Sequence, residues 1–340
     1  MVISHNFYMH LALQEAWKYQ LLTYPNPAVG ALVTAHCGKI LSIEAHQRAG
    51  FPHAEVLALQ KAYYQLRQDE KILELTDSHE IHEYLLQNHQ HCFYGCEIYT
   101  TLEPCSHVGK TPSCANLIKV LGLKRVYIGS RDFNTKARNG GKLLEESGIE
   151  VVYDVFKKSC DDLLIPFKNY MDGNFVFFKW AQRLDGSTND GTITSLASRE
   201  LVHKMRDVCD LLVIGGNTVR MDRPTLDARL CNGKAPDILI YSKEKEFDQT
   251  IPLFNVGGRK IYISDTLDMI QDYKCVMIEG SQNMFEATQD IVDLHVSFVA
   301  PTMKPSDGFR DLDVEFEILH TQKIENDLLL WMKQKDKDGR

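Results

Sequence analysis

Three side chains of metal-binding type and one carboxylate stand out in this chain. His53 and Glu55 lie two residues apart, and Cys105 and Cys114 follow after a long gap. Histidine and cysteine are ligands that zinc prefers, and three protein ligands leave a fourth position open for water. A carboxylate that is not a ligand can carry protons to and from that water. The set therefore indicates a catalytic zinc site of the kind that deaminates bases or nucleotides.

Prolines precede both metal-binding runs. Pro52 comes before His53 and Pro104 before Cys105, and proline favours the first position of a helix. We therefore expect both runs at helix N-termini. There His53 and Glu55 can face one ion, although residues i and i+2 are roughly 200° apart around a helix. A helix N-terminus also favours a cysteine thiolate over the thiol.

Two other interpretations of these residues stay open. Nine cysteines in 340 residues supply chance pairs, and a single histidine or cysteine on an apolar background is commonly a core residue. A structural zinc site would need a fourth protein ligand, for which Cys92, Cys96 and His107 are the nearest candidates. Glu55, placed as a proton carrier, favours the catalytic interpretation.

Composition and charge narrow the substrate class. A chain of 340 residues with 44% hydrophobic content can bury a substantial core and is long enough for two domains. No apolar run reaches the length of a membrane span, and the polar N-terminal stretch is unlike a signal peptide. The odd cysteine count predicts reduced thiols and a cytoplasmic location. A net charge of -8, without a dense basic cluster near the metal-binding residues, favours a small substrate over a nucleic acid.

The elements that must position the metal-binding residues alternate between helix and strand. Hydrophobic residues recur at helical spacing over about 5–22, and Thr23–Pro27 then breaks the helix before a strand at Val29–Val33. Further strands are expected at Glu97–Thr100 and Arg125–Ile128. This alternation predicts an α/β layer structure.

A polar, charge-rich stretch from about Arg67 to Gln90 interrupts this pattern. The histidines at 79, 82, 89 and 91 lie in or beside it and raise the question of a second metal site. We interpret them instead as polar residues scattered over an inserted surface element.

A second α/β unit is expected after about residue 150, because short apolar runs start again there. The runs cover 175–180, 211–214, 238–241, 260–263, 276–278 and 296–300. The sequence has no Gly-x-Gly-x-x-Gly motif, so a Rossmann nucleotide site has no support. We predict domains at 1–150 and 151–340.

Three motifs in the N-terminal half, Pro25–Gly30, His46–Val56 and Thr101–Cys114, resemble those of the bifunctional deaminase–reductases of riboflavin biosynthesis. The gap of eight residues between the two cysteines departs from the two-residue gap of many zinc deaminases and is similar to this family's own form.

The resemblance implies a cytidine-deaminase-like three-layer domain. In such a domain His53, Cys105 and Cys114 would bind zinc, Glu55 would be the catalytic acid and base, and Asn26 would help to seat the pyrimidine.

The C-terminal half resembles the family's reductase domain, whose fold is an α/β fold like that of dihydrofolate reductase. The similar segments are Lys179–Gly186, Ile193–Ser195 and Gly216–Leu226. The NADPH contacts that the resemblance implies are Gln182, Thr192, Thr218 and Asp222, and the implied substrate contacts are Lys179, Arg206, Leu226, Arg229 and Glu279. Arg206 and Arg229 would clamp the phosphate through their forked donors.

The sequence departs from the family pattern in two places. The insertion between Val56 and Glu97 should leave the zinc chemistry intact but reshape the rim of the site. The segment Glu279–Asn283 keeps one glycine where the family has a glycine-rich loop for the cofactor phosphates, so we expect weak NADPH binding.

The function that the resemblance implies has two steps. A diaminopyrimidine ribosyl phosphate would be deaminated with zinc, and its ribose would then be reduced to a ribityl chain with NADPH. The alternatives are a deaminase whose C-terminal domain is only a scaffold, a zinc-stapled binding protein, and an RNA-editing factor. We expect no nucleic-acid or membrane partner, and the sequence is compatible with a homo-oligomer.

Overall fold

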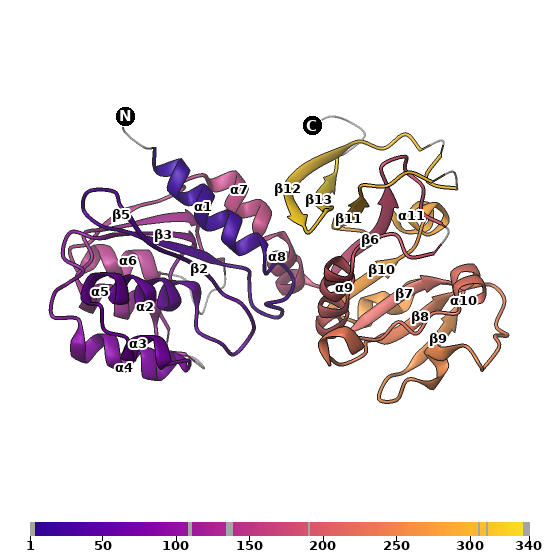
Figure 1. The fold of residues 1–340 in the computed structure, drawn as a ribbon, viewed down its shortest axis with the longest axis horizontal. Coiled ribbons are helices and arrows are strands. Elements are labelled where there is room, and N and C mark those ends of the chain that lie inside the picture. Colours follow the sequence, from indigo (N-terminus) through magenta and orange to yellow (C-terminus); the bar gives the residue numbers. More distant parts are fainter. Residues whose placement is uncertain are drawn as a thin grey trace. The chain divides into compact units, whose positions relative to one another are not determined.

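The computed structural model divides the chain into two compact units, Met1–Phe167 and Lys168–Arg340 (Figure 1). It describes residues 4–107, 111–133, 139–189, 191–304, 307–310 and 312–335. The division falls later than the predicted residue 150. The reason is that β5 (Glu150–Val152) pairs with the sheet of the first unit, and α7 (Lys157–Leu163) packs beside that sheet.

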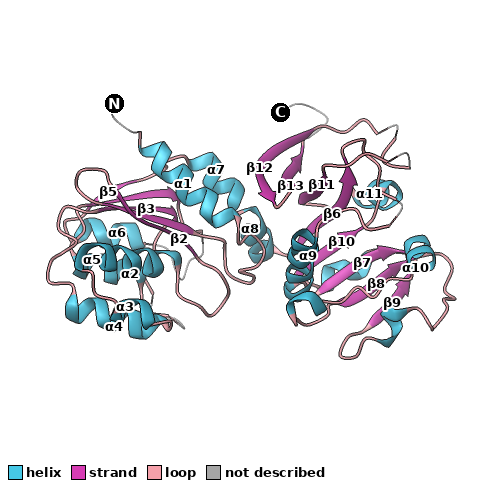
Figure 2. Ribbon diagram, in the orientation of Figure 1, coloured by secondary structure: helices cyan, strands magenta, loops and turns pink. Residues whose placement is uncertain are grey.

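The first unit is built on a five-stranded sheet with the order β2-β1-β3-β4-β5. Besides β5, its strands are β1 (Gly30–Thr34), β2 (Ile40–Ala45), β3 (Glu97–Leu102) and β4 (Arg125–Ser130). β1 pairs with β2 and β3 in antiparallel register, whereas β3, β4 and β5 run parallel. Nearly every residue of β1, β3 and β4 is buried because helices cover both faces of the sheet (Figure 2).

Helices form the two outer layers of this unit. One face carries α1 (His5–Trp17) and α7, and the other carries α2 (Ala54–Arg67), α5 (Cys114–Leu121) and α6 (Gly140–Glu146) (Figure 2). The helix predicted for 5–22 thus ends five residues earlier, in a series of turns.

The insertion lies at the surface, but one face of it is part of the folded core. It forms α3 (Lys71–Glu74) and α4 (Ser78–Asn88), which pack against α2, and α4 also contacts α5. Ile81 and Leu85 of α4 are fully buried, and so is His82 apart from 4% of its surface. The prediction that all its histidines lie on the surface was therefore wrong for His82.

The second unit contains an eight-stranded sheet with the order β12-β13-β11-β6-β10-β7-β8-β9. The strands are β6 (Phe175–Arg183), β7 (Leu211–Gly215), β8 (Asp237–Tyr241), β9 (Ile261–Ser264), β10 (Cys275–Glu279), β11 (Leu294–Ala300), β12 (Phe316–Ile324) and β13 (Asp327–Gln334). β6 to β11 pair in parallel, and the β12–β13 hairpin joins the β11 edge in antiparallel register. The α/β fold expected here is confirmed.

Short helices connect these strands. They are α9 (Leu196–Val208), α10 (Gly216–Asp222) and α11 (Gln282–Thr288), together with the 3-10 turns η1 (Arg229–Cys231), η2 (Pro252–Asn255) and η3 (Asp268–Asp272). α8 (Ile165–Asp172) precedes β6, and the division between the two units falls within it. After β9 at one edge the chain returns to the centre and inserts β10 between β6 and β7. In open parallel sheets, ligands bind beyond the carboxyl ends of strands where the strand order reverses in this way.

Among the described residues, no helix is long and apolar enough to cross a membrane.

Candidate functional site

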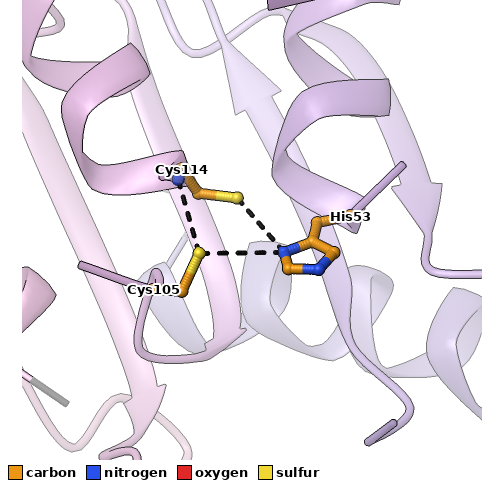
Figure 3. A group of neighbouring side chains, drawn as sticks. All are labelled: His53, Cys105 and Cys114. Atoms are coloured by element: carbon orange, nitrogen blue, oxygen red, sulfur yellow. Dashed lines mark hydrogen bonds between the residues drawn. The ribbon is translucent and has the colours of Figure 1, made fainter. Parts of the chain in front are cut away.

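The structure brings His53, Cys105 and Cys114 together (Figure 3). The Nδ1 atom of His53 lies 3.8 Å from the Sγ atom of Cys105 and 3.4 Å from that of Cys114. Among the described residues, these three side chains form the one group of three or more histidine, cysteine or acidic side chains close enough together to hold a metal ion. The candidates for a fourth ligand, Cys92, Cys96 and His107, are not part of it.

The spacing of these atoms suits a tetrahedral zinc ion. Zn–N bonds of about 2.05 Å and Zn–S bonds of about 2.3 Å place the N and S atoms of a tetrahedral site about 3.6 Å apart. The two N–S distances in this chain lie on either side of that value. One imidazole and two thiols are also a donor set that zinc prefers. The residues therefore fit the metal, with one position left for water.

Three different elements position the trio. His53 directly precedes α2, and Cys114 is the first residue of α5, as expected for helix N-termini. Cys105 instead lies in the loop that follows β3, so the prediction that Pro104 starts a helix was wrong. This loop docks on the start of α5, where the carbonyl of Cys105 accepts hydrogen bonds from Ala115 N (3.1 Å) and Ser113 Oγ (2.9 Å).

The docking gives Cys105 the environment that a helix of its own would have supplied. The backbone N–H of Cys114 donates to the Sγ atom of Cys105 over 3.4 Å. A hydrogen bond from the Cys114 thiol, together with the interaction with His53, lowers the pKa of Cys105 to about 4 against the effect of burial. Cys105 is thus a thiolate, the form that binds metal, at neutral pH.

The second ring nitrogen of His53 is also engaged. Its Nε2 atom lies 3.3 Å from the hydroxyl of Thr111. A partner on the nitrogen that does not face the metal fixes the orientation of a histidine ligand. Sequence reasoning gave Thr111 no role, although it lies inside the motif that carries Cys105 and Cys114.

Glu55 lies beside the trio without belonging to it. It is the second residue of α2, and 4% of its surface is exposed. Burial raises the pKa of its carboxyl to about 7, although His53 acts in the opposite direction. A carboxyl group with a pKa near neutrality can both accept and return a proton at physiological pH.

Asn26 is linked to the loop before His53 through His46. The Nδ1 atom of His46 lies 3.0 Å from the carbonyl of Pro52, and its Nε2 atom lies 3.0 Å from the Asn26 amide nitrogen. The carbonyl can only accept, so Nδ1 carries the proton and Nε2 accepts from Asn26. Burial lowers the pKa of His46 to about 4, which keeps this neutral tautomer at physiological pH. Asn26 is therefore held in one orientation by a residue to which the sequence analysis gave no role.

In the second unit, an ion cluster forms at the carboxyl end of the central strands. Glu279, the last residue of β10, is directly opposite Lys179 of β6, and their charged atoms lie 3.4 Å apart. Arg206 of α9 donates to both carboxylate oxygens of Glu279, over 2.7 and 3.0 Å. Burial would raise the pKa of Glu279, but Arg206 and Lys179 lower it to about 2. Three predicted substrate contacts thus share one cluster.

The two predicted phosphate-binding arginines are joined through Asp227. Arg206 donates from Nη1 to the backbone carbonyl of Asp227 over 3.3 Å, and Arg229 donates to its carboxylate over 2.6 Å. Leu226 precedes Asp227 in the chain and is buried. Both arginines therefore have acidic partners in this structure, Glu279 for Arg206 and Asp227 for Arg229. Asp227, which organises them, was not foreseen.

The predicted NADPH contacts are less closely grouped. Gln182 lies near the end of β6, where it accepts a hydrogen bond from Trp180 Nε1 over 2.8 Å, and Thr218 lies in the first turn of α10 after β7. Asp222 ends α10, and Thr192 lies exposed in the loop between β6 and α9. In the described part of the chain, these four side chains are not hydrogen-bonded to one another.

The single glycine of the segment 279–283 has a packing role. β10 ends at Glu279 and α11 begins at Gln282, so the connection is very short. A Cβ atom on Gly280 would lie 2.5 Å from the Cβ atom of Met284, which is closer than side chains can approach. Glycine therefore lets α11 pack directly at the end of β10.

Comparisons with known proteins match both units. Residues 3–130 match the model of the cytidine and deoxycytidylate deaminase zinc-binding region, and residues 174–330 match that of the RibD C-terminal domain. The chain is 34% identical over 257 residues to the riboflavin biosynthesis protein RibD of Aquifex aeolicus (strain VF5), which covers 73% of this chain and 64% of the relative. It is 32% identical over 266 residues to RibD of Bacillus amyloliquefaciens, with 76% and 64% covered. The chain thus spans slightly less than two thirds of the length of these relatives.

Solved structures agree with these matches. The deaminase/reductase from Thermotoga maritima, described as a diaminohydroxyphosphoribosylaminopyrimidine deaminase and 5-amino-6-(5-phosphoribosylamino)uracil reductase, superimposes with a TM-score of 0.66 at 26% identity, covering 97% of this chain and 98% of that one. RibD of Acinetobacter baumannii, at 23% identity, has the same fold with a TM-score of 0.64, covering 97% of this chain and 99% of that one. The fold is therefore an α/β fold of two domains, a deaminase zinc-binding domain followed by one that matches the RibD C-terminal domain.

Proposed function

We propose that the chain is a member of the RibD family of riboflavin biosynthesis proteins, and that it is a bifunctional enzyme that deaminates a diaminopyrimidine ribosyl phosphate and then reduces its ribose. The observation that carries this proposal is the trio His53, Cys105 and Cys114, at zinc-binding distances, beside the buried carboxyl of Glu55.

In the first step the chain's residues bind, orient and move protons. His53, Cys105 and Cys114 would hold the zinc ion, which when bound makes a water molecule a stronger nucleophile at neutral pH. Glu55 takes a proton from this water and later returns it to the departing amine. Water adds to the ring carbon that bears the amine, and ammonia leaves. The Asn26 amide, held by His46, orients the pyrimidine.

The second step would use the ion cluster of the second unit. Arg206 and Arg229 bind the phosphate, and Lys179 and Glu279 hold the hydroxyl groups of the opened ribose. NADPH, when bound, supplies the hydride. Gln182, Thr192, Thr218 and Asp222 would hold that cofactor. Because residues 174–330 match the RibD C-terminal domain, the alternative of a deaminase with a mere scaffold attached is not favoured.

The proposal is tested by incubating the purified full chain with the diaminopyrimidine ribosyl phosphate, with and without NADPH. Ammonia should appear in both samples, and NADPH should be oxidised only after ammonia release begins. Absence of ammonia in both samples would refute the deaminase, whereas ammonia without oxidation of NADPH would refute the reductase.

A further inference from the structure

Arg259 is tied to the backbone of two loops in the second unit. It lies just before β9, and its Nη2 atom donates to the carbonyls of Thr225 (2.8 Å) and Leu253 (2.7 Å). Its Nη1 atom donates to the carbonyl of Leu226. All three acceptors are neutral carbonyls. The planar fork of a guanidinium can reach three such acceptors at once, which a lysine ammonium cannot do in the same geometry.

One of these carbonyls belongs to a residue with an unusual backbone. Leu226 has a φ of 52°, in the left-handed region that non-glycine residues rarely adopt, and 5% of its surface is exposed. Such a conformation persists where the surrounding contacts enforce it, and it is frequent at functional sites. Arg259 supplies this enforcement together with Leu253, whose N–H donates to the carbonyl of Pro224 over 3.0 Å.

The strained loop leads directly to the ion cluster. Asp227 follows Leu226, and its carbonyl and carboxylate bind Arg206 and Arg229. η1, which begins at Arg229, packs against α9, the helix that carries Arg206. A change in the backbone at Leu226 would therefore move Asp227 and both arginines with it.

We propose that Arg259 is a positioning residue for the second unit: by binding the carbonyls of Thr225, Leu226 and Leu253, it holds Asp227 in the place that orients Arg206 and Arg229 toward the ribose phosphate. This inference rests on the proposed reductase function. Arg259 does not touch the substrate in this account and acts through the loop alone.

Two substitutions of Arg259 distinguish a role in holding the loop from a role of its positive charge. Arg259→Lys keeps the positive charge and the apolar stem but loses the fork, and Arg259→Gln loses both charge and fork. If Arg259 acts by holding the loop, the lysine variant should behave like the glutamine variant. If it only attracts the phosphate through its charge, the lysine variant should behave like the wild type.

The experiment measures reduction of the deaminated ribosyl phosphate by the full chain, with NADPH oxidation as the signal. Both variants should raise KM for this substrate about tenfold, the loss expected when hydrogen bonds from a charged group disappear. kcat and the Kd for NADPH should change little, because neither Arg259 nor its loop is part of the proposed cofactor site. An unchanged NADPH Kd also shows that the second unit is folded, which a general loss of structure would not give.

Lys245→Gln serves as the matched control. Lys245 lies in the same unit and pairs with Asp265 at an exposed site, over 2.7 Å, so its loss should leave KM unchanged. A wild-type KM in Arg259→Lys would overturn the inference while leaving the proposed function intact. If the wild-type chain does not oxidise NADPH with this substrate, the proposed reductase function fails, and the inference falls with it.

Discussion

At the scale of single residues, Glu55 combines the two properties that a proton carrier beside zinc needs. It lies next to the three ligand side chains without joining them, and burial raises its pKa to about 7. The first property follows from its position as the second residue of α2, two residues after His53. The sequence spacing was therefore enough to predict its neighbourhood, whereas its burial depends on the packing of the whole unit.

Replacing Glu55 by Gln should abolish deamination and leave zinc in place. Glutamine keeps the size of the side chain but cannot accept the proton, so we expect a rate loss of about 10² or more. The measurements are ammonia release and zinc content of the same preparation. A variant that deaminates at the wild-type rate, or that has lost its zinc, would contradict the role assigned to Glu55.

Glu279 makes the stability of the second unit depend on pH. Its ordinary pKa of 4.5 is lowered to about 2 in the folded chain, against the effect of burial, because Arg206 and Lys179 bind the carboxylate. A carboxyl group with a lowered folded-state pKa stabilises the fold above its unfolded pKa, and this contribution is lost as the pH falls through the folded pKa. The free energy of unfolding of the wild type, measured with denaturant, should therefore decrease as the pH falls from 4.5 to about 2.

The variant Glu279→Gln provides the comparison. It should be less stable than the wild type by about 3 kcal/mol at neutral pH, because it leaves a buried arginine without its carboxylate. The difference between the two proteins should shrink as the pH falls toward 2. An equal difference at both ends of the range would show that the ion cluster does not stabilise the unit.

At the scale of elements, the start of α6 holds the loop that carries Cys105. The N–H of Gly141 donates to the carboxylate of Glu103 over 2.9 Å, and the other oxygen of Glu103 accepts from the N–H of Asp132 over 3.1 Å. Gly140 lies so close to this loop that a Cβ atom there would be 1.7 Å from the carbonyl oxygen of Pro104. The absence of a side chain at Gly140 is therefore required by the position of the cysteine loop.

Replacing Gly140 by Ala should displace the loop at Pro104 and with it the neighbouring Cys105. We expect zinc affinity to fall by about 10-fold to 100-fold, the range found when the residues that orient metal ligands are changed. Competition with a chelator measures this affinity. The control is Gly173→Ala, because a Cβ atom at Gly173 would meet nothing within 4 Å. Equal zinc affinities in the two variants would show that α6 does not position Cys105.

The regular elements of the fold could be predicted more readily than the loops between them. The strands at 97–100 and 125–128 were predicted because runs rich in apolar, aromatic and β-branched residues favour strands over helices. They are the first four residues of β3 and of β4. The loop at Cys105 was predicted as a helix, because Pro104 has the same local signal as Pro52. What distinguishes them is the docking of this loop on α5 and α6, which no local pattern contains. Similarly, α4 buries His82 against distant helices, although its sequence is polar.

Distant contacts also account for the site residues that were missed. His46, Thr111 and Asp227 act through partners that are 20, 58 and 21 residues away in the sequence. Acidic groups also bind both arginines: Glu279 binds Arg206, and Asp227 binds Arg229. The sequence gives no sign that these acidic groups lie beside the arginines. A resemblance to a family indicates which residues contact the ligands, but it does not indicate which residues hold those side chains in place.

At the scale of the whole molecule, the two proposed activities belong to units with separate cores. The trio His53, Cys105 and Cys114 lies wholly in the first unit, and the ion cluster around Glu279 lies wholly in the second. Metal removal should therefore affect the two reactions differently. Deamination should depend on zinc, whereas reduction of a supplied deaminated substrate should not.

The most direct test of the account is a zinc titration of the metal-free full chain, with ammonia release from the diaminopyrimidine ribosyl phosphate as the signal. The account predicts no release without zinc, a rise in proportion to added zinc up to one equivalent per chain, and no response in Cys114→Ser at any zinc concentration. NADPH oxidation with the supplied deaminated substrate should stay constant throughout. Ammonia release that does not depend on zinc, or that persists in Cys114→Ser, would contradict the central claim that His53, Cys105 and Cys114 form a catalytic zinc site.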